Sequence, residues 1–117
     1  MKNLTIGSTK IKVIMDKKLG DKTGVVAQYH VGKNEIHMQT GLTPDNHTSN
    51  LIHEAMHAIF HEYSIYKCFD LKAPMTEYEQ HLFFFMEELF VTNISNAICS
   101  MLRTNPELVK LIAKTYK

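Results

Sequence analysis

The first 40 residues alternate between apolar and polar side chains, which is the pattern of β-strands. The clearest case is the segment KIKVIMD, residues 10–16. We expect one face of this strand to point into a core. The side chains on that face are Ile11, Val13 and Met15.

A turn and two further strands are expected next. Residues 18–24, KLGDKTG, hold two glycines and an aspartate, which tolerate the positive φ angles of a turn. The segments VVAQYHV, residues 25–31, and NEIHMQT, residues 34–40, predict strands, and the GKN between them is typical of a hairpin. The N-terminal third therefore predicts a small, mainly antiparallel sheet.

After Gly41 the apolar spacing changes to about 3.6 residues, which predicts helices. Thr43, Pro44 and Asp45 supply an N-cap hydroxyl, a proline at the first helical position and an acid at the positive end of the helix dipole. We expect a helix over about 44–63. Because apolar residues cover most of its circumference, we also expect it to be buried in the middle of the domain.

A second long helix is predicted from Thr76 and Glu79, which form a capping box, to about Arg103. A short terminal helix then starts at Asn105 and Pro106. The fold class is α+β, with the sheet packed on the first long helix and the second closing the site. The length of 117 residues predicts one domain, residues 1–117.

Composition excludes several classes of partner. The 13 basic and 12 acidic side chains leave no basic excess for nucleic acid. Cys68 and Cys99 are too few for a disulfide framework or a thiolate zinc site. The apolar run Leu82–Met86 is far shorter than the roughly 20 residues of a membrane span. We expect a cytoplasmic protein with neither a nucleic acid nor a membrane partner, and the sequence predicts no oligomeric state.

The segment LIHEAMHAIFH, residues 51–61, carries the candidate chemistry. His53 and His57 lie one helical turn apart, so that both imidazoles can bind one zinc ion. Glu54 is rotated about 100° from His53, which leaves it free to act as the general base of an HExxH enzyme. Two buried imidazoles beside a buried carboxylate would be costly without an ion, so we expect bound Zn²⁺.

His61 is not expected to bind the same ion. It lies about 12 Å along an unbroken helix from His53, whereas two ligand atoms of one zinc are about 3 to 4 Å apart. Metzincins place a glycine and a longer spacing before their third histidine, and this chain has neither. We interpret His61 as a structural residue or as a partner of a ligand.

The third ligand is expected from the second long helix. Its segment FFFMEELFV sets Glu87 and Glu88 in the most apolar part of the chain, where an unpaired carboxylate would be costly. Helical projection favours Glu87, near the centre of the apolar stripe, and puts Glu88 at its edge. On this ground alone both glutamates remain candidates.

The segments LIHEAMHAIFHEYSI, EELFVTNISNAI and LRTNPELVKLI together resemble small phage and bacterial metallopeptidase-like proteins related to ImmA/IrrE-type zincins. The resemblance covers about residues 48–112. It implies a minimal gluzincin, in which a glutamate on a second helix is the third zinc ligand. The matching glutamate lies three residues before Val91 and is followed by an SNA-like segment, which points to Glu88. We follow the resemblance and keep Glu87 as the alternative.

These observations lead to a zinc metallopeptidase as the expected function, with His53, His57 and Glu88 as ligands and Glu54 as general base. Its substrate would be a peptide or protein, in the cytoplasm of a bacterium or a phage-infected host. The alternative is a phage-type regulatory or interaction protein that keeps zinc and the zincin fold without proteolysis.

Other elements of a peptidase site are less well defined by the sequence. The strand Glu35 to Gln39 is expected at the sheet edge, where it would align the substrate. Thr92 is the only polar partner at the spacing that usually orients the ligand glutamate. No residue can be assigned to stabilise an oxyanion, and each candidate is more readily explained as structural. The candidates are Tyr29, Tyr63, Tyr66, His30, His37 and His81.

Overall fold

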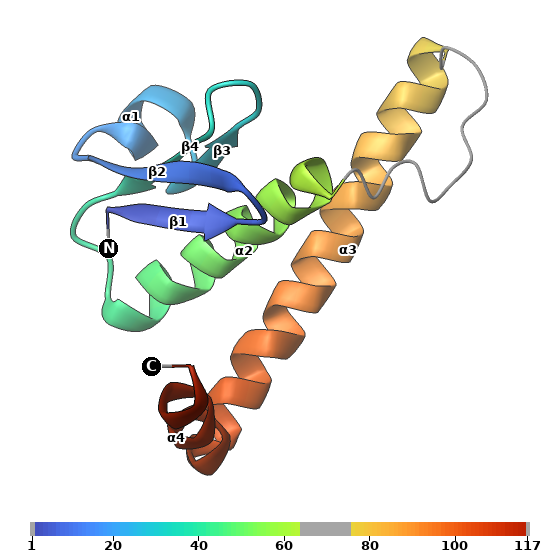
Figure 1. The fold of residues 1–117 in the computed structure, drawn as a ribbon. Coiled ribbons are helices and arrows are strands. Elements are labelled where there is room, and N and C mark those ends of the chain that lie inside the picture. The colour runs from blue at the N-terminus through green and yellow to red at the C-terminus, as the bar shows by residue number, and fades with distance from the viewer. Residues whose placement is uncertain (1, 64–75, 117) are drawn as a thin grey trace.

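The computed structural model describes residues 2–63 and 76–116 (Figure 1). In these residues a four-stranded sheet precedes two long helices and a short terminal one, so the predicted α+β class is confirmed. In chain order the elements are β1 (Asn3–Ile6), β2 (Thr9–Asp16), α1 (Leu19–Thr23), β3 (Ala27–His30), β4 (Glu35–Gln39), α2 (Pro44–Glu62), α3 (Glu77–Thr104) and α4 (Pro106–Thr115).

The strands are ordered β1-β2-β4-β3 in the sheet. The pairs β1/β2 and β3/β4 are antiparallel, as predicted for a mainly antiparallel sheet with a β3/β4 hairpin, whereas β2 and β4 are parallel. The expectation that Glu35–Gln39 forms the edge is wrong. That segment is β4, which lies between β2 and β3 because the chain crosses over before it pairs with β2. The edge strand beside α2 is β3.

The predicted turn at residues 18–24 is instead mostly helical. Leu19–Thr23 form α1, because the side chain of Leu19 is anchored in the protein with only 3% exposure. Gly24 then ends the helix with φ of 78°, a left-handed conformation that glycine adopts without strain.

The core lies between the sheet and α2. Alternation in β2 and β4 buries Ile11, Ile36 and Met38 against Ala58 of α2. Met15 was expected in this core, but it lies near the end of β2 and is 48% exposed. The alternation therefore continues beyond the core.

Helix α2 has the predicted bounds to within a residue, and the Thr43 hydroxyl caps it by accepting a hydrogen bond from the Asn46 N–H at 3.2 Å. Its burial is less complete than expected. Among its apolar side chains only Ala58 and Phe60 are fully buried, and the others are partly exposed. The reason is that the sheet and α3 cover only parts of its circumference.

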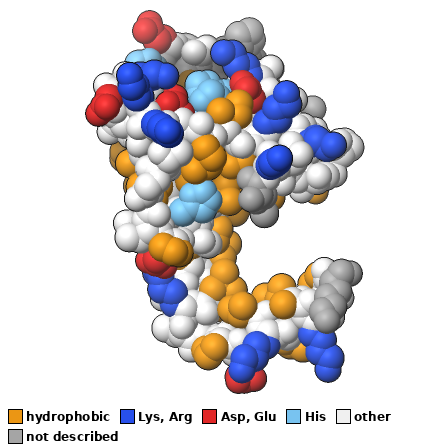
Figure 2. Space-filling view, turned by 90° about the vertical axis from the view of Figure 1, so that its left-hand side faces the viewer, with side chains coloured by type: hydrophobic (Ala, Val, Ile, Leu, Met, Phe, Trp, Pro, Cys, Tyr) orange, Lys and Arg blue, Asp and Glu red, His pale blue; other side chains and the backbone are white. Residues whose placement is uncertain are grey.

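Helix α3 runs antiparallel along α2. The N-cap half of its predicted capping box is present, with the Glu79 N–H donating to the Thr76 hydroxyl at 3.2 Å. The Glu79 carboxylate accepts from that same hydroxyl, at 3.1 Å, instead of from the Thr76 backbone N–H. The far end is joined to the start of α2 by Arg103, whose guanidinium donates to both oxygens of Asp45 at 2.9 and 3.1 Å. Helix α4 turns away from the end of α3, and hydrophobic side chains line the hollow between it and the main body (Figure 2).

The buried side chains of α3 form a single stripe against α2. It consists of one side chain every fourth residue, the spacing of one helical face. Two of its four members are polar. The stripe is Glu87, Val91, Ser95 and Cys99, all buried.

Candidate metal centre

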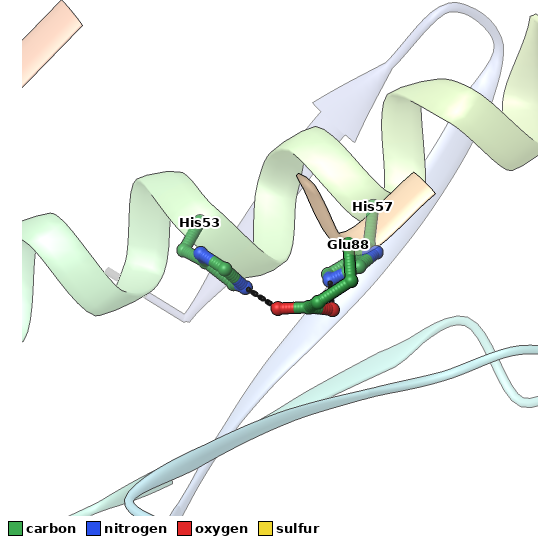
Figure 3. Close-up of side chains that lie close together, drawn as sticks. All are labelled: His53, His57 and Glu88. Atoms are coloured by element: carbon green, nitrogen blue, oxygen red, sulfur yellow. Dashed lines mark ion pairs between the residues drawn. The ribbon is translucent and has the colours of Figure 1, made fainter. Parts of the chain in front are cut away.

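The side chains of His53, His57 and Glu88 converge between α2 and α3. The Glu88 carboxylate lies between the two rings, with one oxygen 3.1 Å from His53 Nε2 and the other 3.0 Å from His57 Nε2 (Figure 3). One potential ligand atom from each residue lies within 4.8 Å of the other two. Antiparallel packing of α3 on α2 produces this convergence, because it brings the turn that carries Glu88 opposite the two histidines.

The donor set fits zinc. Two imidazole nitrogens and one carboxylate oxygen, with an open fourth position, form a common catalytic zinc site. Ligand atoms bound at about 2.0 to 2.1 Å on a tetrahedral ion lie about 3 to 4 Å apart. The distances of 3.0 and 3.1 Å between the nitrogens and the Glu88 oxygens are at the short end of this range.

The other ring nitrogen of His53 faces Ser95. Ser95 Oγ is 3.5 Å from His53 Nδ1, and it donates its own proton to the Val91 carbonyl at 2.6 Å. The serine oxygen is therefore an acceptor toward the ring, which favours a proton on Nδ1. This tautomer leaves the lone pair of Nε2 directed toward Glu88, where an ion would bind.

Glu87 has the same role for His57. Its buried carboxylate lies 3.2 Å from His57 Nδ1 and 3.5 Å from His61 Nε2. Projection correctly indicated that Glu87 is the more buried glutamate, but burial directs it to the outer nitrogen of His57. Glu88, at the edge of the stripe, is the one that reaches both Nε2 atoms. His61 thus lies beside the site and contacts Glu87, the partner of the candidate ligand His57.

The pKa values of His57 and His61, the two histidines that contact Glu87, are shifted in opposite directions. Burial by itself lowers the pKa of His57, but the hydrogen bond to Glu87 and the charges of Glu54, Glu87 and Glu88 outweigh it, so the pKa is raised. The pKa of His61 is lowered, mainly by burial. His57 is therefore the more basic of the two.

Glu54 is buried at 9% exposure beside the cluster. Its pKa is raised because burial disfavours the charged form, although His57, His53 and a hydrogen bond from the Tyr29 backbone N–H oppose that effect. A carboxylate with a raised pKa in a partly desolvated position has the character of a general base.

A cavity of about 680 Å³ joins these groups to the edge of the sheet. Its wall combines residues of α2 and α3 with the chain from Gly24 to Tyr29, which includes most of β3. Because the Tyr29 N–H points outward to Glu54, the alternate residue Ala27 directs its N–H and C=O along the same outer edge of β3.

The remaining sequence candidates lie in different places. Of the five oxyanion candidates among the described residues, only Tyr29 lines the cavity. His30 and His37 stack at 4.2 Å between ring centroids, on the sheet face opposite α2, while Tyr63 and His81 are exposed and Tyr66 lies outside the described residues. Thr92 does donate to Glu88, at a long 3.4 Å.

Sequence reasoning missed the roles of Glu87 and Ser95. A signal for both was present, because Glu87, Val91, Ser95 and Cys99 repeat every four residues, as do His53, His57 and His61. Two helices that pack along matched four-residue rows bring the side chains of one row against those of the other. Polar members of one row are then natural partners for histidines in the other.

Comparisons of the chain with protein-family models, with curated proteins and with solved structures found no match. The resemblance to small zincins therefore depends on the sequence segments alone.

Proposed function

We propose that the protein is a zinc-dependent peptidase of the HExxH type. The observation that carries the proposal is the approach of ligand atoms of His53, His57 and Glu88 to within 4.8 Å of one another. Glu54, which follows His53 in the sequence, lines the same cavity. In the proposed site, Glu88 and the two Nε2 atoms hold the ion, and Ser95 and Glu87 fix the orientation of the rings.

Zinc, when bound at such a site, polarises a peptide carbonyl and lowers the pKa of a water molecule. Glu54 accepts the proton from that water as its oxygen attacks the carbonyl carbon. When the C–N bond breaks, Glu54 returns the proton to the departing amine nitrogen. The backbone N–H of Tyr29 keeps the carboxylate in place throughout, because it donates to Glu54.

The position of β3 supports an extended peptide as the substrate. This edge strand borders the cavity that also contains the histidines and Glu54. A peptide strand that adds to the outer edge of β3 would pair with the backbone of Ala27 and would run past Glu54. The backbone thus supplies affinity without regard to sequence, and the cavity wall supplies selectivity.

The test compares the parent with Glu54→Gln in the zinc-loaded state. We expect equal zinc content by elemental assay and loss of peptide hydrolysis by the variant, because glutamine keeps the acceptor for Tyr29 but cannot take a proton. Hydrolysis is measured on an unstructured protein such as casein and on a library of fluorogenic peptides. Equal cleavage by both proteins, or a parent without stoichiometric zinc, would contradict the proposal.

If the parent binds zinc but cleaves none of these substrates, the alternative of a zinc-containing regulatory or interaction protein is favoured. The second experiment then compares Glu54→Gln with Glu88→Ala and measures the biological function of each variant in place of hydrolysis. A binding protein should tolerate Glu54→Gln, which leaves the ligands intact, and should fail with Glu88→Ala.

A further inference from the structure

The first two thirds of α3 carry an apolar surface on the side that faces away from α2 and on one flank of the helix. With about 100° of rotation per residue, Phe85 and Leu89 are turned about 160° to 200° from Glu87, which faces α2. They are 61% and 48% exposed. Further side chains at four-residue spacing widen this surface. The α3 outer patch is defined as Leu82, Phe85, Met86, Leu89, Phe90 and Ile94, each at least 37% exposed.

The outer patch ends at Ile94, and beyond it Met101 is the one large apolar side chain of α3 that is exposed. Along the same outward direction, the C-terminal half of α3 carries Asn93, Asn96 and Ser100, all of them exposed. The apolar side chains are therefore not an accident of a helix that is apolar throughout. A helix that is apolar both toward its own core and away from it is typical of one covered on both sides.

We propose that the outer patch is the interface between two copies of this chain, paired through their α3 helices. Because a large side chain presents about 150–250 Å² when fully exposed, the six partly exposed side chains leave roughly 500 Å² of apolar surface in contact with water. That is at the upper end of the patches found on monomers. A two-fold pair would bury about twice this area, and its polar rim would extend it toward the roughly 1,200–2,000 Å² of stable interfaces.

Charge favours an antiparallel arrangement of the two helices. Glu77 and Glu79 make the start of α3 acidic, whereas α4, which follows its end, carries Lys110 and Lys114 against one acid, Glu107, which lies 3.5 Å from Lys110. Parallel pairing would put the acidic ends together. Antiparallel pairing brings the acidic start of one α3 toward the basic α4 of the other copy, and a two-fold axis repeats the contact in the opposite sense.

The same charges argue against a membrane as the occupant. Within the described residues α3 is long and apolar enough, by length and composition, to cross a bilayer. However, its charged side chains before Arg103 are all glutamates, and Glu87 lies in the middle of the helix, where it is bonded to His57. Anionic leaflets attract basic segments and repel acidic ones. A second copy provides an apolar surface without this penalty.

Helix α4 also carries exposed apolar side chains. Val109, Leu111 and Ile112 are each at least 41% exposed, and the hollow between α4 and the main body is lined with hydrophobic side chains (Figure 2). This hollow lies between α4 and the main body, whereas the outer patch faces away from α2, so α4 is not counted in the area of the outer patch.

Sedimentation velocity of the purified protein over a range of concentrations tests the proposal. We expect the mass of two chains for the parent and of one chain for Phe85→Glu/Leu89→Glu, because pairing would bury two unpaired charges. The control Thr5→Glu/Ser8→Glu adds the same two charges on β1 and the turn after it, both exposed positions away from α3, and should remain dimeric. Circular dichroism and zinc content, unchanged in all three proteins, establish that the fold is intact.

A parent that sediments as a monomer at every concentration overturns the proposal, and so does a dimer that the Phe85→Glu/Leu89→Glu variant leaves intact. If the parent is a monomer, co-sedimentation with phosphatidylserine-containing vesicles shows whether the outer patch binds a membrane. A parent that does not bind the vesicles would instead cover the patch with another part of its own chain. This inference is independent of the proposed peptidase activity, because its readout is mass and the altered residues lie outside the metal centre.

Discussion

The assignment of Glu88 as ligand and Glu87 as a positioning residue predicts different losses of zinc affinity. Glu87 accepts from His57 Nδ1 at 3.2 Å, and carboxylates in this position orient metal-binding histidines. Removing such a partner typically costs 10- to 100-fold in metal affinity, or about 1.4 to 2.7 kcal/mol. Glu87→Ala should fall in this range.

The conservative variant Glu87→Gln sharpens the prediction. Glutamine retains an oxygen acceptor for His57 but loses the charge, and a hydrogen bond to a charged group exceeds a neutral one by about 1 kcal/mol. We therefore expect about 5-fold weaker zinc binding, between the parent and Glu87→Ala. Glu88→Ala removes a ligand and its charge together, and should exceed the 100-fold loss.

Competition against a chromophoric zinc chelator at neutral pH measures all four affinities. Asn93→Ala serves as the matched control, since Asn93 is an exposed residue of α3 that faces away from α2. The reasoning is refuted if Glu88→Ala binds zinc as tightly as the parent while Glu87→Ala loses it. Equal affinities of the parent and Glu87→Ala would refute the orienting role of Glu87 alone.

Two further predictions concern stability. The raised pKa of His57 means that, without metal, its proton stabilises the fold below about pH 6.5 and that this contribution is lost as pH rises through the higher folded value. Zinc needs the neutral ring, so the rise in Tm on adding zinc should grow from about pH 6 to about pH 8. At a hundredfold excess of zinc over Kd, the free energy of unfolding should increase by about 2.7 kcal/mol; a rise in Tm independent of pH would contradict this. Ile36→Ala should cost about 2 to 5 kcal/mol in urea unfolding, because Ile36 has no exposed surface, whereas Val31→Ala, at an exposed position, should change little. A loss at Ile36 no larger than that at Val31 would place the core elsewhere.

The sequence predicted those elements whose signals are local. Caps at Thr43 and Thr76 and the proline at 44 fixed the starts of α2 and α3, because a cap bonds to residues within one turn. The parallel pairing of β2 with β4 had no local signal, since residues far apart in sequence determine it. For the same reason the edge strand was misassigned to β4. The helix at Leu19 was missed because one buried leucine outweighs the turn propensity around it.

The candidate site was predictable to a similar extent. The spacing of His53 and His57 is a property of one helix, and the structure keeps it. The choice between Glu87 and Glu88 depended on how α3 is rotated against α2, which neighbouring residues do not determine. Hydrophobic projection identifies the side chain that points most directly at α2. A side chain that reaches both His53 and His57 must instead lie beside the buried stripe, as Glu88 does.

The fully buried side chains of α3 form a single stripe against α2, and two of the four, Glu87 and Ser95, are polar. Little apolar area is therefore removed from water along this seam, and polar bonds to the histidines provide much of the attachment. Separation of α3 should cost less free energy than disruption of the sheet, as in proteins that open in sub-global steps. An ion bound by residues of both helices would couple the separation of α3 to the unfolding of the sheet. Metal content would then decide whether the chain melts in one cooperative transition or in two.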